Sequence, residues 1–147
     1  MNQHKSVGRF ISCVNRYGKI HLHNELEPYH LGSGQFHFLM ALYHKDGINQ
    51  EHLAELLRID KGTCARALKR LEDEGYVTRA IDTNDKRAYQ IFLTEKAQQM
   101  RPVIGRILRE WTKTLLTGFS EEEKELLFTF LERIAENATT EKIHETR

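Results

Sequence analysis

Cysteine and long apolar runs are scarce in this chain, and each scarcity removes a class of protein. Only two cysteines, Cys13 and Cys64, occur among the 147 residues, so the chain is not a disulfide-built secreted scaffold. No apolar run approaches the roughly 18 residues that a membrane helix needs, and the N-terminus carries no targeting pattern. We therefore expect a protein of the cytoplasm that does not bind a membrane.

The residue patterns of known catalytic sites are also missing. The sequence contains no phosphate-binding glycine loop, no His-Glu-x-x-His and no Gly-x-Ser-x-Gly. Gly32-Ser33-Gly34 is too short to be more than the entry of a helix. We expect neither enzymatic activity nor a cofactor.

Eight histidines invite a metal-site interpretation, but their spacing is unfavourable. His21 and His23 diverge on a helix, and His37 and His44 are two turns apart. A dedicated zinc site usually needs three or four convergent ligands. We expect no metal site, and metal sensing stays an alternative function.

The net charge is close to zero, which argues against a generally basic coat for nucleic acid. Its distribution along the chain is uneven, however. Residues 118–147 carry eight glutamates against four cations, so they sum to −4, and the overall charge of +1 leaves +5 for residues 1–117. A cationic body with an acidic end can orient a protein on DNA.

Residues 48–94 hold the most informative pattern, which begins as a helix-turn-helix. Gln50–Leu57 is predicted to be a short helix with Asn49 as its N-cap. Its inward residues are Leu53, Leu56 and Leu57. Arg58-Ile59-Asp60 has the length of the turn in this motif but lacks the glycine that many such turns contain. The aspartate of that turn then caps a second helix, Lys61–Glu74.

The second helix has one apolar and one basic face. Its apolar stripe is Cys64, Leu68, Leu71 and Gly75, with Ala67 beside it. From Lys61 to Leu71 there are four cations and no acid, whereas three acids follow at residues 72–74. A groove entered by the N-terminus of this helix would meet only the basic part.

Helix N-termini bind anions, and Gly62 and Thr63 leave backbone N–H groups there accessible to a phosphate. Long basic side chains further along reach base edges or backbone. The expected DNA contacts on this helix are Lys61, Gly62, Thr63, Arg66, Lys69 and Arg70. For the helix taken alone, an ordinary solvated surface is the alternative.

A two-stranded hairpin, or wing, is predicted after the second helix. Tyr76–Ala80 and Tyr89–Leu93 have strand-like patterns, and the residues between them are dense in turn formers. Arginine at such a tip suits the negative potential of a narrow minor groove. We expect Arg87 to enter the groove, Asp85 to hold it extended, and Lys86 to lie against the same DNA. A hairpin turn with solvated charges is the alternative for the tip alone.

Amphipathic helices are predicted on both sides of this motif. The first runs from about Lys5 to Leu26, with the stripe Val7, Phe10, Ile11, Val14, Tyr17 and His21. Gln35–His44 follows, with Phe36, Leu39, Met40 and Tyr43 inward. Thr94 caps a long helix after the hairpin. The capping box Ser120–Glu123 opens the last helix, whose stripe is Leu126, Leu127, Phe130, Leu131, Ile134 and Ala138.

A winged helix needs no such flanks for its own fold, so we interpret them as a dimer interface. The predicted organisation is one protomer, 1–147, with a winged helix-turn-helix at 33–94 and dimerisation helices at 5–30 and 95–147. The fold class is mainly α with a small β-hairpin wing. A monomer with a larger helical core is the alternative.

Together these residues resemble the MarR family of transcriptional regulators, including its SlyA relatives. The matching pieces are Leu31…Gln35-Phe36…Leu39…Leu42, Leu53-Ala54-Glu55…Asp60-Lys61-Gly62-Thr63…Leu68…Leu71-Glu72…Gly75-Tyr76-Val77…Arg79, Asp82…Asp85-Lys86-Arg87-Ala88 and Leu93-Thr94. The chain departs from the family at Gly32, where threonine or serine is common, and at Thr83, where proline is common. These departures concern a helix cap and a turn.

The resemblance implies a homodimer on a pseudo-palindromic operator, with recognition helices in major grooves and wing arginines in the adjacent minor grooves. It also implies a repressor that releases double-stranded DNA when a small molecule, often an anionic phenolic compound, binds between the dimer helices and the winged helix. Arg16 and Tyr17 on the first helix are our candidate ligand contacts, because Arg16 would pair with a carboxylate. A surface arginine beside a tyrosine at the edge of the core is the alternative.

Two other functions stay open. A winged helix can serve protein–protein contact, although that use requires neither a basic second helix nor an arginine-tipped wing. A regulator of this fold can also sense oxidants through cysteine. Cys64 falls on an inward stripe, where a thiol is usually a small hydrophobic residue, and Cys13 lies between an apolar stripe and a polar face.

Overall fold

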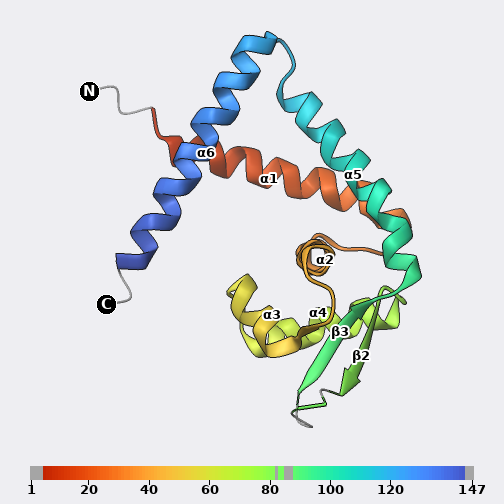
Figure 1. The fold of residues 1–147 in the computed structure, drawn as a ribbon. Coiled ribbons are helices and arrows are strands. Elements are labelled where there is room, and N and C mark those ends of the chain that lie inside the picture. The colour runs from red at the N-terminus through yellow and green to blue at the C-terminus, as the bar shows by residue number, and fades with distance from the viewer. Residues whose placement is uncertain (1–4, 82, 85–87, 145–147) are drawn as a thin grey trace. The chain divides into compact units, whose positions relative to one another are not determined.

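The computed structural model describes residues 5–81, 83–84 and 88–144 (Figure 1). In chain order the elements are α1 (Val7–Leu26), the 3-10 helix η1 (Glu27–Tyr29), α2 (Ser33–His44), β1 (Ile48–Asn49), α3 (Gln50–Leu57), α4 (Lys61–Asp73), β2 (Val77–Ile81), β3 (Tyr89–Leu93), α5 (Glu95–Leu115) and α6 (Glu121–His144). They divide between two compact units, Met1–Leu108 and Arg109–Arg147. The predicted fold class, mainly α with a small β wing, is confirmed.

The helix-turn-helix forms from α3 and α4, as the sequence predicted. The Asn49 side chain accepts the N–H groups of Glu51 and His52, at 2.9 and 3.2 Å, and so caps α3. At the end of α3, Arg58 takes the left-handed conformation, with φ 54° and ψ 46°. Arg58 therefore fills the role that glycine has in many such turns, and the chain is redirected within three residues.

The end of α4 directs the chain into the hairpin. Gly75 has φ +80° and donates its N–H to the Glu72 carbonyl at 2.9 Å, while the Tyr76 N–H donates to the Leu71 carbonyl at 2.8 Å. These two bonds form a Schellman motif, which needs a left-handed residue at its centre. Strand β2 therefore begins at Val77, directly after the motif, rather than at Tyr76.

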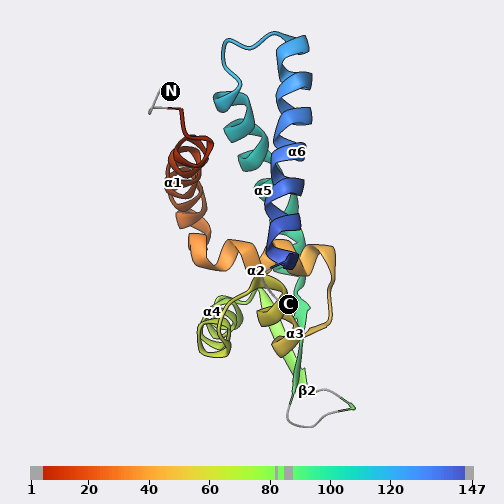
Figure 2. The same ribbon diagram turned by 90° about the vertical axis from the view of Figure 1, so that its left-hand side faces the viewer.

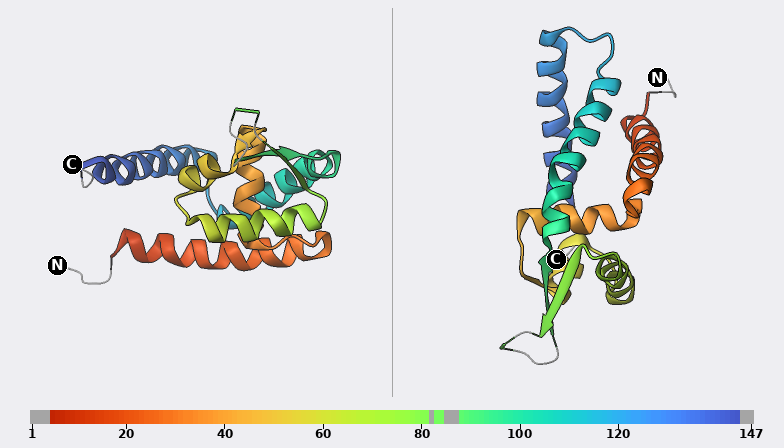
Figure 3. Two further views of the ribbon diagram at one scale, coloured as in Figure 1. Left: turned by 90° about the horizontal axis from the view of Figure 1, so that it is seen from below. Right: turned by 90° about the vertical axis from the view of Figure 1, so that its right-hand side faces the viewer.

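The sheet has three antiparallel strands in the order β1-β3-β2. In the hairpin, Arg79 lies opposite Ile91 and Ile81 lies opposite Tyr89. Strand β1 was not predicted; it pairs Ile48 with Ile91 and is only two residues long, too short for any alternation to be visible. Figures 2 and 3 show the hairpin extending past the level of α4.

The core of the first unit gathers apolar side chains from α2, α3, α4, the sheet and the first half of α5. Fully buried examples are Leu39, Leu53, Leu68, Ile91 and Ile107. The helices thus pack around the helix-turn-helix and hold α4 by one face only, leaving its other face exposed.

Two residues predicted to face inward do not. Leu56 is 55% exposed and Met40 is 37% exposed. In α3 the buried Leu53 and Ala54 lie on one side, and at roughly 100° per residue Leu56 falls beyond the edge of their arc. The buried residues of α2 are Phe36, Phe38, Leu39 and Leu42, so of the predicted residues Phe36 and Leu39 are buried, Tyr43 is half-buried and Met40 lies at the rim.

The flanking helices begin at polar caps. Ser6 accepts the Arg9 N–H at 3.3 Å, so α1 begins at Val7 rather than at Lys5. Thr94 accepts the Ala97 N–H at 3.3 Å and caps α5 as predicted. The predicted apolar stripe of α1 is largely exposed in the single chain, at 57% for Val7 and 62% for Phe10.

The second unit contains the end of α5 and α6. Ser120 and Glu123 form the predicted capping box, with the Glu123 N–H donating to the Ser120 hydroxyl and the Ser120 N–H donating to the Glu123 carboxylate. The exposed apolar residues of α6 are Leu126, Phe128, Phe130 and Leu131. In the part of the chain that the structure describes, no helix is both long enough and apolar enough to cross a membrane.

Candidate nucleic-acid interface

The two faces of α4 differ sharply in burial and charge. Its inner face buries Cys64, Ala67, Leu68 and Leu71, as the stripe predicted. Its outer face exposes all the residues of this helix that were expected to meet DNA, which are Lys61, Gly62, Thr63, Arg66, Lys69 and Arg70. The fold therefore buries the apolar face of this helix and leaves its cations exposed.

A chain of hydrogen bonds runs along the first turns of α4. Asp60 accepts both the Thr63 N–H at 2.8 Å and the Thr63 hydroxyl at 2.6 Å. The Thr63 hydroxyl in turn accepts Arg66 Nη2 at 3.2 Å. The two bonds from Thr63 hold the pKa of the Asp60 carboxyl below its usual range. The helix cap thereby orients the first arginine of the basic face.

This arrangement corrects one expectation. The Thr63 N–H was expected to be free for a phosphate, but it already donates to Asp60. At Gly62 an added Cβ would lie 3.2 Å from Asp60 Oδ1 and 3.3 Å from Arg66 Nη1. Glycine at this position therefore leaves room for both side chains at the start of the helix.

The cations of α4 are not equally available. Lys61 pairs with Glu51 at 3.3 Å, and Lys69 pairs with Asp73 one turn further along α4. Both pairs are largely exposed, so each is weak and exchangeable. Among the described residues, Arg66 and Arg70 have no acid within ion-pair distance. These two arginines are thus the strongest candidates for contacts to a polyanion.

A shallow hollow of about 490 Å³ lies between α4 and β2. Its lining residues are Ala65, Arg66, Lys69, Arg70, Asp73 and Arg79. Arg79 comes from β2 and was not among the predicted contacts. Its signal in the sequence is weak, because an arginine seven residues after Glu72 returns to that glutamate only if a tight turn intervenes.

Arg79 makes two hydrogen bonds to Glu72, from Nε at 3.2 Å and from Nη2 at 3.1 Å. This contact lowers the pKa of the Glu72 carboxyl and raises the pKa of the Arg79 guanidinium. Strand β2 is thereby joined to the far end of α4 by a side-chain ion pair.

The predicted wing contacts Asp85, Lys86 and Arg87 lie outside the described residues. The strands on either side of them are described, and β2 and β3 form the predicted hairpin. The part of the wing whose geometry can be described is therefore its two strands, β2 and β3.

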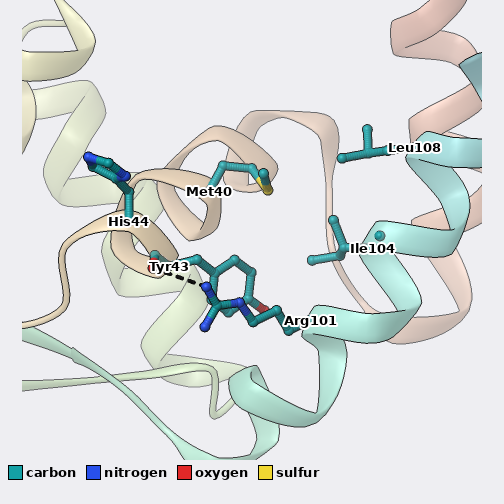
Figure 4. Close-up of a pocket in the computed structure, with 7 residues that line it drawn as sticks. Met40, Tyr43, His44, Arg101, Ile104 and Leu108 are labelled. Atoms are coloured by element: carbon teal, nitrogen blue, oxygen red, sulfur yellow. Dashed lines mark hydrogen bonds between the residues drawn. The ribbon is translucent and has the colours of Figure 1, made fainter.

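The candidate ligand residues Arg16 and Tyr17 lie on the exposed side of α1. The Arg16 guanidinium lies 5.9 Å from the centre of the Tyr17 ring, which is 57% exposed. A pocket of about 550 Å³ lies elsewhere in the first unit, between α2 and α5, and neither residue lines it. The residues that do are Met40, Tyr43, His44, Arg101, Ile104, Gly105 and Leu108 (Figure 4).

The polar groups of this pocket come from Tyr43 and Arg101. Arg101 lies over the Tyr43 ring at 5.2 Å and donates to its carbonyl oxygen at 3.4 Å (Figure 4). The Tyr43 hydroxyl donates to the Ala97 carbonyl, and burial raises the pKa of Tyr43 to about 12. The pocket thus combines apolar walls with one guanidinium that has no acid partner among the described residues.

The cysteines differ in their surroundings. Cys64 is fully buried and points toward the Gln50 carbonyl, with Sγ at 3.8 Å from the oxygen. Burial raises the pKa of the Cys64 thiol, so it stays protonated and poorly reactive. Cys13 is half-buried on α1. Within the described ranges, histidine, cysteine and acidic side chains form no cluster of three or more that could hold a metal ion.

Comparison with known proteins identifies relatives over most of the chain. The MarR family profile matches residues 31–89. The HTH-type transcriptional regulator YybA of Bacillus subtilis (strain 168) is 36% identical over 113 residues, which cover 77% of this chain and 75% of that protein. A MarR transcriptional regulator from Methanosarcina mazei Go1 has a similar structure, with 46% identity, a TM-score of 0.85, and coverage of 91% of this chain and 96% of that one.

A further solved structure contains nucleic acid. It is a MarR family transcriptional regulator from Listeria monocytogenes complexed with 26mer DNA. That chain is 33% identical to this one, with a TM-score of 0.79, and the match covers 93% of this chain and 91% of that one.

Proposed function

The chain belongs to the MarR family of transcriptional regulators, and on that premise we propose that it binds double-stranded DNA as a homodimeric repressor. The observation that carries the proposal is the outer face of α4, where Arg66 and Arg70 are exposed and lack acid partners within the described ranges. The DNA complex of the Listeria relative supports the same reading.

In this proposal α4 enters the major groove with its N-terminus first. Arg66 and Arg70 contact base edges or phosphates, Lys61 and Lys69 exchange their exposed acid partners for phosphates, and the small Gly62 and the polar Thr63 allow close approach. Arg87 enters the adjacent minor groove, with Asp85 orienting it and Lys86 on the backbone. The acids at the far end of α4 stay away from the DNA.

Dimerisation is proposed because apolar residues remain exposed on helices that precede and follow the winged helix in the sequence. On α1 they include Phe10 at 62% and Tyr17 at 57%, and on α6 they include Leu126 at 55% and Phe130 at 50%. Such faces on a single chain mark an interaction surface. A second copy also gives the two-fold symmetry that a pseudo-palindromic operator requires. By occupying the operator, the dimer would then block RNA polymerase.

Release from DNA is proposed to follow binding of an anionic aromatic compound. The pocket between α2 and α5 suits such a ligand, because Arg101 would pair with its carboxylate and Met40, Ile104 and Leu108 would contact its ring. Arg16 and Tyr17 on α1 are the second candidate site. A ligand at either site lowers DNA affinity only to the extent that it binds the DNA-free conformation of the protein more tightly than the DNA-bound one.

Fluorescence anisotropy tests DNA binding with a duplex from upstream of the gene and a scrambled duplex of equal length, at two salt concentrations. We expect tight binding to the upstream duplex alone, weakening steeply with salt. Alanine at Arg66, Arg70 or Arg87 should cost about 1–3 kcal/mol each. Lys113→Ala, which removes an exposed cation from α5, is the matched control. If all three arginine variants bind the upstream duplex as tightly as the wild type, this mechanism is excluded and a winged helix that contacts protein is favoured.

Two further measurements separate the remaining parts of the proposal. Sedimentation equilibrium should give twice the protomer mass, and Phe10→Glu should shift the species toward one copy. Salicylate, used as a probe anion, should lower DNA affinity in the wild type. Arg101→Met should abolish that response if the pocket between α2 and α5 is the site, whereas Arg16→Met should abolish it if α1 is.

A further inference from the structure

We infer that Glu72, Arg79 and Tyr89 form a clamp that fixes the direction of the β2–β3 hairpin relative to α4, and that specific DNA binding depends on it. The inference rests on the proposed DNA-binding function. It assigns these three residues to positioning the reading elements, while the contacts themselves come from α4 and the wing.

The clamp joins three elements through one guanidinium. Arg79 of β2 donates Nε to Glu72 Oε2 at 3.2 Å and Nη2 to Glu72 Oε1 at 3.1 Å. Two parallel bonds to one carboxylate fix the plane of the guanidinium as well as its position. The Tyr89 ring of β3 lies with its centre 5.2 Å from the same guanidinium.

The clamp contacts the hairpin beyond the residues that the end of α4 holds. The Schellman motif and the buried Val77 hold only the first residues of β2. Arg79 lies two residues further along, and Tyr89, which pairs with Ile81, lies at the end of β3 next to the wing loop. Arg79 thus lies at the level of the buried Ile91 of β3, and Tyr89 extends the clamp two residues closer to the loop than this core contact.

The clamp is also partly shielded from solvent. The side chains of Arg79 and Glu72 are 23% and 32% exposed, whereas those of the Lys69–Asp73 pair are 58% and 57% exposed. A bidentate pair with less water around it holds its geometry better than an exposed single contact. Arg79 also lines the hollow that Arg66, Lys69 and Arg70 line.

Helix and wing must reach neighbouring grooves at the same time, so their relative direction matters for an operator and much less for random DNA. Glu72 has a further diagnostic property, since it is an acid beside a polyanion-binding face. By charge alone, its removal should strengthen binding to any DNA. As a clamp, its removal should weaken binding to the operator specifically. The two effects have opposite signs.

The test compares Glu72→Gln with Glu74→Gln in the full-length protein, against operator and scrambled duplexes. Both variants remove one negative charge at the same end of α4. The Glu74 side chain makes no hydrogen bond or ion pair among the described residues. We expect Glu72→Gln to bind the operator about tenfold more weakly, a typical coupling between contacting residues, with scrambled-duplex affinity unchanged or slightly higher. Glu74→Gln should bind the operator as tightly as the wild type or tighter.

A second variant, Arg79→Lys, keeps the charge but cannot make the bidentate contact. We expect it to lose operator affinity as Glu72→Gln does, with an unchanged dependence of affinity on salt. If Arg79 instead neutralises a phosphate directly, lysine would preserve the affinity, and Arg79→Gln would lower the salt slope by about one charge. In a double-mutant cycle of Glu72→Gln and Arg79→Gln, the double variant should lose no more operator affinity than the single variant that binds the operator more weakly.

Circular dichroism melts establish that each variant is folded at the assay temperature. Wild-type affinity in Glu72→Gln or in Arg79→Lys would overturn the clamp and leave the proposed function standing. Equal loss on operator and scrambled DNA would also overturn it. A wild type that shows no preference for the operator over scrambled DNA would overturn the proposed function and the clamp together.

Discussion

Two left-handed residues, one after each helix of the helix-turn-helix, predict stability changes of opposite sign. Arg58 ends α3 with φ 54°, and Gly75 follows α4 with φ +80°. Both lie in the left-handed region, which suits glycine and strains other residues. We expect Arg58→Gly to stabilise the protein and Gly75→Ala to destabilise it.

The magnitudes follow from two terms. A non-glycine residue in the left-handed conformation costs about 1–2 kcal/mol. Glycine gives back about 0.4–1 kcal/mol by loosening the unfolded chain. Arg58→Gly should therefore raise the free energy of unfolding by roughly 0.5–1 kcal/mol, and Gly75→Ala should lower it by a similar amount. No clash adds to the second change, because the nearest atom to an added Cβ at Gly75 is Lys96 Cδ, at 3.9 Å.

The assay is urea unfolding followed by circular dichroism at one protein concentration, since the stability of an oligomer varies with concentration. Gly34→Ala is the control. Gly34 lies in α2, an added Cβ there meets nothing within 4 Å, and alanine should stabilise by up to about 1 kcal/mol. Destabilisation by Arg58→Gly, or a neutral Gly75→Ala with the slope of unfolding unchanged, would show that the backbone argument is wrong.

Three other experiments test the surroundings of single groups. The pKa of Glu72 lies below its ordinary 4.5 in the folded protein, so its contribution to stability is present above that pH and is lost as pH falls through the folded pKa; acid unfolding should be less steep in Glu72→Gln. A thiol reagent should modify Cys13 well before Cys64, because the latter is fully buried with a raised pKa, and equal rates would contradict that placement. Tyr43 has a pKa of about 12, so the alkaline absorbance titration should lose its highest component in Tyr43→Phe.

The sequence predicts the helix-turn-helix well because its signals are local. Asn49, Asp60 and Thr94 cap the helices that follow them, as expected from residue type alone. The buried stripe of α4 repeats at helical spacing, so the exposed basic face is fixed as soon as the helix is recognised. Both features depend on neighbours within four residues.

Features that depend on distant partners are predicted poorly. Strand β1 exists only because Ile48 finds Ile91 across the sheet. Leu56 has the residue type of a core position, yet the short α3 buries Leu53 and Ala54 instead. Apolar character alone does not distinguish Leu53, which meets the core, from Leu56, which does not, because the elements that pack against α3 decide which side of it is buried.

The same distinction separates the two proposed binding sites. The residues of α4 that are proposed to contact DNA lie within ten positions of one another on a single helix. The pocket between α2 and α5 forms only where Tyr43 meets Arg101, 58 residues away. No periodicity links those two residues, so the sequence alone does not predict this pocket and favours Arg16 and Tyr17, which are adjacent in the chain. The contrast between Arg101→Met and Arg16→Met therefore decides whether the proposed effector binds between the packed helices α2 and α5 or at the adjacent residues of α1.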